Sequence, residues 1–154
     1  MYFVMVLLLL LLLPAASVGM EAIGVQHPQG LMFLMGKWLV FWGVGVRLFL
    51  AGTRQVIQPR FTAQEIFQIQ SAEPLPIVRE LGFANLSMGT LGVSSLFETS
   101  WIVPAAIAGG LYYGLAGLGH IGQKGKNAKE YTAMVSDGFV FVLLAAFLVS
   151  HFSG

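Results

Sequence analysis

Five apolar stretches, bounded by the few charged residues, dominate the pattern of the chain. No charged residue precedes Glu21, and none follows Asp137. None lies between Glu80 and Glu98, or between Glu98 and Lys124. A helix needs ~20 apolar residues to cross ~30 Å of hydrocarbon, and continuous apolar runs favour helices over the alternating strands of a barrel. We therefore predict five spans: Tyr2–Gly19, Leu31–Gly52, Glu80–Phe97, Ile102–Gly122 and Tyr131–Phe152.

The composition excludes a soluble globule. Hydrophobic residues make up 56% of the 154 residues and charged residues 10%, whereas soluble domains carry about 25% charged residues to cover their surface. The net charge of +1 does not suit a nucleic-acid binder, and the absence of cysteine excludes disulfides and thiolate metal sites. The predicted fold class is all-α: a polytopic transmembrane helical bundle that forms a single membrane domain over residues 1–154.

The first span has some features of a signal peptide. The leucine run Leu7–Leu13 is followed by Pro14 and small residues up to Ser17, which resembles a hydrophobic core and cleavage site. No Lys or Arg precedes the run, so an uncleaved anchor is favoured. Cleavage would leave four spans, with every loop on the same side as before.

The Lys and Arg residues predict the orientation. Two loops on one side, Thr53–Arg79 and Gln123–Glu130, together carry six of them, and the opposite side carries none. The six are Arg54, Arg60, Arg79, Lys124, Lys126 and Lys129. Because basic loops stay in the cytoplasm, we expect a cytoplasmic N-terminus and a periplasmic or extracellular C-terminus.

The longer basic loop contains a predicted interfacial helix over residues 62–70. Thr62 and Glu65 form the T-x-x-E pattern of a capping box. Apolar and glutamine residues then alternate in a way that suits a helix lying in the membrane interface, and Pro74 and Pro76 end it. A plain connector is the alternative.

Small residues recur on one face of two spans. In the third span they are Gly82, Gly89 and Gly92, and in the fourth Ala106, Gly110, Gly114 and Gly117. Such stripes let helix backbones approach closely. We expect these two spans to pack against each other within one bundle; the alternative is the seam of a homodimer. The G-x-G-x-x-G pattern at Gly117–Gly122 follows no strand, so it does not indicate nucleotide binding.

Five polar residues are predicted to share the cytoplasmic half of the bilayer. Span directions place Arg47, Glu80, Asn85, His120 and Asp137 at similar depth, on four different helices. Ionisable residues at membrane depth are costly, so each suggests a function. The layer is either an ion-paired plug that fixes helix packing or a pocket for protons, a quinone or a lipid headgroup. A metal site is disfavoured because Arg47 would oppose a cation.

On the opposite side, Lys37 lies about two turns inside the second span. We expect it either to extend its ammonium outward to the interface or to pair with Glu98. Both roles are structural.

Three segments carry a family resemblance: Pro76–Phe97, Pro104–Ile121 and Ala133–Phe141. They resemble a family of small bacterial integral membrane proteins of unknown function, which in general style is similar to the DoxX-like four-helix membrane proteins. The most specific parts are R-E-L-G-F-A-N at Arg79–Asn85 and G-L-G-H at Gly117–His120. The resemblance implies a bacterial helical bundle without bringing an activity, and the leucine-rich first span lies outside the matched region.

These observations favour a non-catalytic protein of the bacterial inner membrane. The leading hypothesis is an accessory or scaffold subunit that self-associates or joins a larger membrane complex, because the short loops leave little room for soluble chemistry. One alternative is a small-ligand protein that binds quinone or lipid, or handles protons, through the polar layer. A second is a small transporter that works as an oligomer. Enzymatic activity is disfavoured without being excluded.

Overall fold

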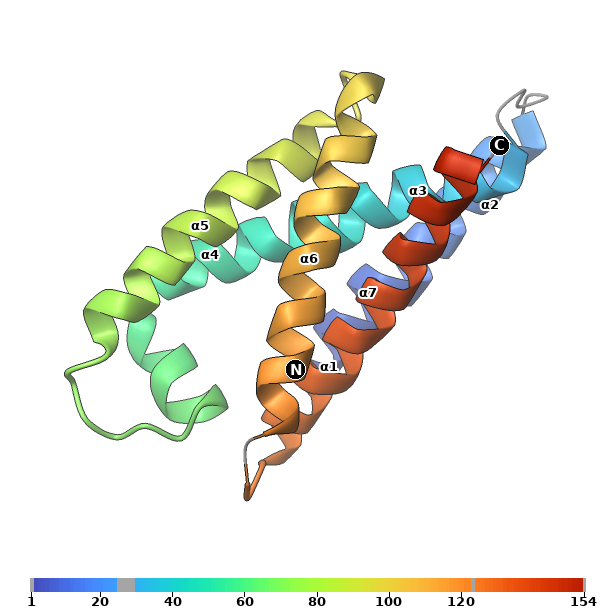
Figure 1. Ribbon diagram of the computed structural model, residues 1–154. Coiled ribbons are helices and arrows are strands. Elements are labelled where there is room, and N and C mark those ends of the chain that lie inside the picture. The colour runs from blue at the N-terminus through green and yellow to red at the C-terminus, as the bar shows by residue number, and fades with distance from the viewer. Residues whose placement is uncertain (1, 25–29, 123, 154) are drawn as a thin grey trace.

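Helices make up the secondary structure of the computed structural model, which describes residues 2–24, 30–122 and 124–153 (Figure 1). Four helical stretches are long and apolar enough to cross a membrane: Tyr2–Ile23, Gly30–Ile57, Thr99–Ile121 and Ala128–Ser153. A fifth helix, α5 (Leu75–Ser94), has 20 residues but a less apolar composition. The predicted all-α bundle is confirmed.

The first two long helices each contain a π-helical turn. The first consists of α1 (Tyr2–Leu7), η1 (Leu8–Leu12) and α2 (Leu13–Gly24), and the second of α3 (Gly30–Leu39), η2 (Val40–Val46) and α4 (Arg47–Ile57). Pro14 lacks the N–H that would bond one turn back, and η1 lies where this bond is missing. Both helices are longer than predicted, and α4 passes Gly52 to end just before Gln58 and Pro59, because a residue preceding proline disfavours the helical conformation.

The predicted interfacial helix is shorter than expected and is not capped as expected. It is the π-helical η3 (Phe61–Ile66), and Gln68 follows it in the left-handed region at φ 59°. The capping-box prediction is wrong, because Thr62 lies buried inside η3 and no side chain caps its start. α5 then begins at Leu75 rather than Glu80, since Pro76 fits the first turn of a helix instead of ending one.

The remaining elements are the short η4 (Thr99–Trp101) and two long helices, α6 (Ile102–Ile121) and α7 (Ala128–Ser153). The last two spans therefore lie close to their predicted bounds. The predicted outer loop Met20–Gly30 is helical up to Gly24 and again from Gly30, and residues 25–29 lie outside the described residues. In the other predicted loop, residue 123 lies outside them too.

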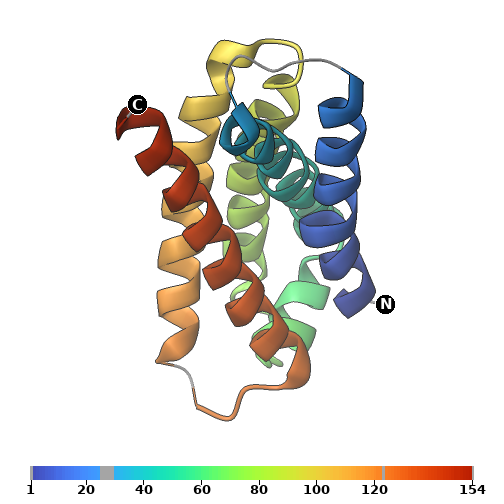
Figure 2. The same ribbon diagram turned by 90° about the vertical axis from the view of Figure 1, so that its right-hand side faces the viewer.

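The helices cross the bundle in alternating directions (Figures 1 and 2). The start of α1, η3 and the connection between α6 and α7 lie at one end, and the connection between α5 and α6 lies at the other, with the C-terminal end of α7. The α6–α7 connection contacts the backbone of η3 directly, as Asn127 Nδ2 donates to the main-chain carbonyl oxygen of Glu65 at 3.0 Å. The two basic loops therefore share one end of the bundle.

Two helix pairs form the densest packing, and they are not the predicted pair. α5 packs along η2 and α4, and α6 packs along α7, whereas α5 and α6 touch much less. The expectation that the third and fourth spans pack against each other is wrong. The reason is that the second span also carries glycines: a Cβ built on Gly52 would lie 2.7 Å from the carbonyl oxygen of Gly82.

The core lies where η2, α6 and α7 meet. Its fully buried members include Val40, Val44, Ala106 and Leu144. Tyr113 joins them, and its hydroxyl donates to the Gly43 carbonyl oxygen at 2.5 Å, so it satisfies a backbone group inside the π-helical turn.

At the opposite end from η3, Lys37 does not pair with Glu98. Its ammonium lies 2.8 Å from Glu21 Oε1 on the neighbouring α2, and the indole of Trp38 donates to the same carboxylate at 2.6 Å. Glu98 instead caps η4 by accepting from the Ser100 N–H. The pairing with Glu98 is wrong because α2 continues past Gly19 and carries Glu21 alongside α3.

Candidate functional site

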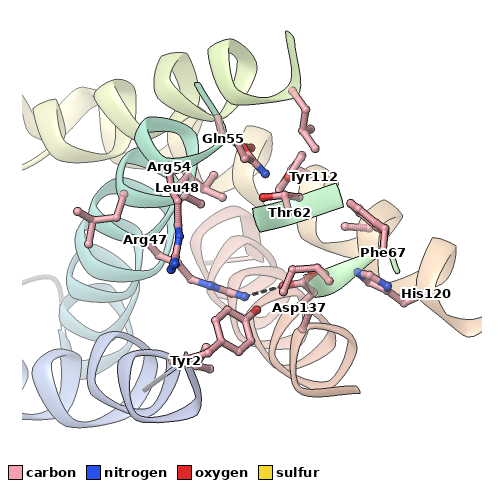
Figure 3. A pocket seen from close by; sticks show the side chains of 18 of the residues that line it. Tyr2, Arg47, Leu48, Arg54, Gln55, Thr62, Phe67, Tyr112, His120 and Asp137 are labelled. Atoms are coloured by element: carbon pink, nitrogen blue, oxygen red, sulfur yellow. Dashed lines mark hydrogen bonds and ion pairs between the residues drawn. The ribbon is translucent and has the colours of Figure 1, made fainter. Parts of the chain in front are cut away.

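A cavity of about 640 Å³ lies between the helices at the end that η3 covers. Residues from both ends of the chain line it, from Tyr2 on α1 to Asp137 on α7, together with residues of α4, η3, α5 and α6 (Figure 3). Ligand pockets of small molecules typically enclose ~300–1,000 Å³ and have mostly apolar walls with a few polar groups. Both the size and the lining of this cavity fit that description.

An ion pair between α4 and α7 forms part of its wall. Arg47 Nη2 donates to Asp137 Oδ1 at 2.8 Å and to Ser136 Oγ at 2.8 Å, and Figure 3 shows Arg47 reaching toward Asp137 beside Tyr2. The two side chains are only 11% and 9% exposed. The guanidinium also lies 4.9 Å from the ring centre of Tyr113. Arg47 Nη1 is buried and has no hydrogen-bond partner among the described residues.

An amide pair between α4 and α5 forms a second polar group. Asn85 Nδ2 donates to Gln55 Oε1 at 2.7 Å, and Asn85 is 1% exposed. Its Oδ1 is buried and accepts no hydrogen bond from the described residues. An unsatisfied buried acceptor costs about 1–3 kcal/mol, so this oxygen is suited to a donor that comes from outside the chain.

The third polar group contains His120, at the end of α6. Its Nδ1 lies 3.6 Å from Glu130 Oε1 on α7, which is within ion-pair distance and beyond hydrogen-bond length. Phe67, just after η3, stacks on the imidazole with ring centres 6.0 Å apart and planes inclined by 13°. His120 thus joins the helical bundle to the segment that covers the cavity.

Four of the five residues of the predicted polar layer line this cavity: Arg47, Asn85, His120 and Asp137. They come from α4, α5, α6 and α7. Glu80 is exposed on α5 and does not line it. No group of three or more His, Asp or Glu residues able to hold a metal ion occurs within residues 2–24, 30–122 and 124–153.

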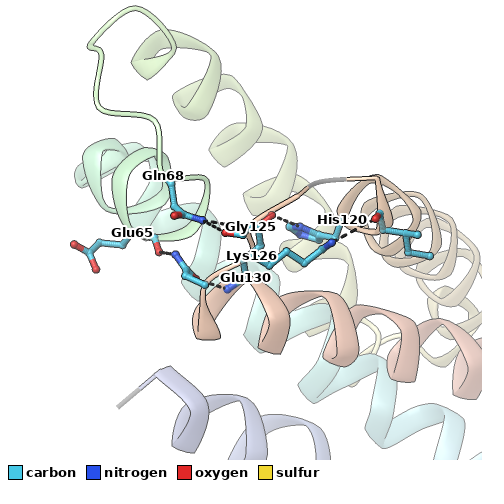
Figure 4. A network of polar contacts seen from close by, with 8 residues as sticks. Glu65, Gln68, His120, Gly125, Lys126 and Glu130 are labelled. Carbon is cyan, nitrogen blue, oxygen red and sulfur yellow. Dashed lines mark hydrogen bonds and ion pairs between the residues drawn. The ribbon is translucent and has the colours of Figure 1, made fainter.

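Polar contacts hold η3 and the segment after it over the end of the cavity (Figure 4). Gln68 Nε2 donates to the Gly125 carbonyl oxygen at 3.1 Å and to Glu130 Oε2 at 3.4 Å. Lys129 forms an ion pair with Glu65, and the hydrogen bond from this ammonium, together with its charge, lowers the pKa of the exposed Glu65 carboxyl. The covering segment is thus tied to the α6–α7 connection by side chains and not only by the chain itself.

The cavity also reaches the apolar outer surface of the bundle. Leu115 on α6 and Leu50 on α4 both line it, yet they remain 69% and 45% exposed. Wall residues that are also exposed mark places where the cavity opens sideways. In a membrane, such an opening would face acyl chains rather than water.

Sequence reasoning missed several wall residues, among them Tyr2, Arg54, Gln55 and Tyr112. The α4 residues had a usable signal, because Arg54 and Gln55 follow Arg47 by seven and eight positions and so share its helical face. That signal requires the helix to continue beyond Gly52. Tyr2 had no signal, since only the folded bundle brings the start of the chain beside α4.

Comparisons with known proteins give one match. No curated protein and no solved structure matches the chain, so the likeness to DoxX-like proteins stays a prediction. A family model matches residues 1–151 and is described as a family of unknown function (DUF6790). The match includes the leucine-rich first span, which corrects the expectation that this span lies outside the family's region. The chain therefore belongs to this family of unknown function.

Proposed function

We propose that this protein is a non-catalytic, multi-pass membrane protein that binds a small amphipathic ligand, a lipid or a quinone, in the cavity between its helices. The observation that carries the proposal is the cavity of about 640 Å³, which is lined by Arg47, Asn85, His120 and Asp137 and reaches the apolar outer surface. A purely structural plug should leave the polar layer dry and fully paired. Buried atoms without partners, such as Asn85 Oδ1, favour the ligand-binding alternative.

The orientation forms part of the proposal. The basic residues gather at the end that carries η3 and the α6–α7 connection, so we place this end, with the N-terminus and the cavity, on the cytoplasmic side of a bacterial inner membrane. The C-terminus then lies on the periplasmic or extracellular side. In this arrangement Tyr2 and Leu9 belong to the cavity wall, which supports an uncleaved first span as part of the proposal.

A pair of glycine substitutions tests the cavity as a binding site. Gly119 lines the cavity and Gly122 does not, and a Cβ built at either position would meet nothing within 4 Å. Both positions therefore accept a larger side chain without a clash at the Cβ. Gly119→Phe should exclude a ligand from the cavity, and Gly122→Phe serves as its matched control.

The measurement is native mass spectrometry of the protein released from its membrane in mild detergent. We expect wild type and Gly122→Phe to retain a bound lipid or quinone, and Gly119→Phe to lose most of it. A wild-type chain that carries no bound amphiphile would overturn the proposal, as would equal occupancy in all three proteins.

A further inference from the structure

The cavity wall carries more positive than negative charge. Its charged side chains are Arg47 and Arg54 against Asp137, which gives a net formal charge of +1 with His120 neutral. Asp137 is already paired with Arg47. Arg54 lies with its guanidinium 3.4 Å from the ring centre of Phe61, and no carboxylate of the described residues lies within ion-pair distance of it. One positive charge in the wall is therefore uncompensated.

Three buried polar atoms of wall residues lack a hydrogen-bond partner among the described residues. One of them, His120 Nδ1, faces the Glu130 carboxylate at 3.6 Å. The other two require opposite partners. Arg47 Nη1 is a donor that needs an acceptor, because Nη2 makes both bonds to Ser136 and Asp137. Asn85 Oδ1 is an acceptor that needs a donor. A guanidinium prefers an oxyanion, with which its hydrogen bonds are charge-assisted.

These requirements distinguish between a lipid and a quinone. Quinone carbonyls only accept hydrogen bonds, so a quinone would satisfy Arg47 but leave Asn85 Oδ1 without a donor and the positive charge uncompensated. A neutral or zwitterionic lipid would also leave the net charge unchanged. An oxyanion that carries a hydroxyl nearby meets all three requirements.

We infer that the cavity binds a monoanionic lipid whose headgroup bears a hydroxyl: the oxyanion lies at Arg47 and Arg54, and the hydroxyl donates to Asn85 Oδ1. The hydrocarbon chain runs along the apolar wall, past residues such as Leu48 and Leu81, toward the opening at Leu115. This inference rests on the proposed function and names the chemical class of its ligand.

The test uses a headgroup series on the full wild-type chain in a neutral detergent, with competition binding read by native mass spectrometry. The probes share their acyl chains: phosphatidylglycerol is monoanionic with hydroxyls, phosphatidylmethanol is monoanionic without them, and phosphatidylcholine is zwitterionic. A short-chain quinone is the fourth probe. We expect phosphatidylglycerol to bind about tenfold more tightly than phosphatidylcholine, the effect of one charge-assisted hydrogen bond, and several-fold more tightly than phosphatidylmethanol.

Two variants and one control connect the preferences to the residues. Arg54→Gln should reduce the preference for phosphatidylglycerol over phosphatidylcholine to less than about threefold. The control Arg79→Gln, at an exposed arginine that does not line the cavity, should keep it. Asn85→Leu should remove the preference for phosphatidylglycerol over phosphatidylmethanol.

The possible outcomes separate this inference from the proposed function. If phosphatidylcholine or the quinone binds the wild-type chain as tightly as phosphatidylglycerol, the anionic-lipid inference is wrong while a ligand cavity stands. If none of the four probes binds, both are wrong. Because the headgroup series is measured on wild type, a variant that fails to fold does not remove the test.

Discussion

The contact between the second span (α3, η2 and α4) and α5 solves two opposite packing problems along its length. In the glycine seam, the backbones come into direct contact: a Cβ on Gly92 would lie 2.5 Å from Gly45 N and 2.6 Å from Gly45 Cα. At the edge of the same contact, Gln55 and Asn85 form a buried hydrogen bond beside a cavity of about 640 Å³. The glycine seam has no room for a methyl group, whereas the cavity edge leaves a polar atom of Asn85 without a partner among the described residues.

The difference shows how a small helical bundle can maintain a cavity between its helices. Lipid supplies no hydrophobic drive for helix association, so close backbone packing has to hold helices together. The seam along Gly45, Gly52, Gly82, Gly89 and Gly92 fixes α5 on the second span. With α5 anchored there, α5 and α6 need not close on each other, and the cavity remains between them. We infer that the seam supports the shape and that the cavity carries the function.

The largest expected effect comes from the ion pair of the cavity wall. Asp137→Asn leaves the Arg47 charge buried without a carboxylate, and breaking a buried pair typically costs about 3–5 kcal/mol. We place this change at about 3 kcal/mol, since the amide oxygen still accepts a hydrogen bond. Thermal unfolding in detergent measures the loss.

A double variant separates charge from packing at the same place. Arg47→Met combined with Asp137→Leu replaces the pair by apolar side chains, and such replacements are often neutral for stability. The double variant should therefore unfold near the wild-type temperature while losing the preference for anionic lipids. Equal destabilisation in the single and double variants would mean that the pair acts through shape rather than charge.

A smaller effect is expected in the glycine seam. Gly92→Ala drives a methyl group against the backbone of Gly45, which cannot move aside as a flexible side chain would. Overpacking of this kind costs about 1–3 kcal/mol, and we expect a value near the middle of that range. Gly19→Ala on α2 is the matched control, because a Cβ there meets nothing within 4 Å, and it should be neutral or slightly stabilising.

The headgroup preference of Gly92→Ala tests whether the glycine seam affects ligand binding in the cavity. Gly92→Ala should lower the unfolding temperature and, in the protein that remains folded, leave the headgroup preference unchanged. Loss of that preference in Gly92→Ala would show that the glycine seam and the cavity edge are coupled rather than independent.

Much of the fold follows from the sequence, because the membrane imposes strong rules. The gaps between charged residues located all five long helices, and the Lys and Arg residues of two loops do gather at one end of the bundle. Helix ends were less predictable. The prolines at 74 and 76 predict the end of a helix, yet Pro76 lies in the first turn of α5. The sequence pattern alone does not distinguish these two roles of proline.

Helix pairing was the main error, and its cause is physical. A stripe of small residues on α5 indicates that another helix packs closely against it, but does not indicate which helix that is. The partner is the second span, whose Gly45 and Gly52 face the stripe. The same limit affects the site. The predicted depths place Arg47 and Asp137 in one layer without naming the pair that they form, and the partner of His120 depends on helix rotation. That partner is Glu130, and Glu80 faces outward.

The smallest expected effect concerns the cover of the cavity and depends on pH. The hydrogen bond from Lys129 holds the pKa of Glu65 below its usual value of 4.5. A carboxyl whose pKa is lowered by folding stabilises the folded state above its unfolded pKa, and this contribution is lost as the pH falls through the folded pKa. Lys129→Gln should therefore lower the unfolding temperature slightly at pH 7 and have a smaller effect at pH 3, because the contribution of the ion pair is lost as Glu65 becomes protonated.

Lys124→Gln is the control for the pH experiment, because Lys124 lies in the connection that leads into α7 and is exposed without an ion pair to a described carboxylate. Removing it changes the net charge by the same amount but should not alter the unfolding temperature at either pH. Both lysine variants should keep the headgroup preference, because neither residue lines the cavity. If Lys129→Gln instead speeds the exchange of bound lipid at pH 7 and Lys124→Gln does not, the ion pair between η3 and α7 controls access to the cavity. The rigid glycine seam would then contrast with a cavity whose cover can move.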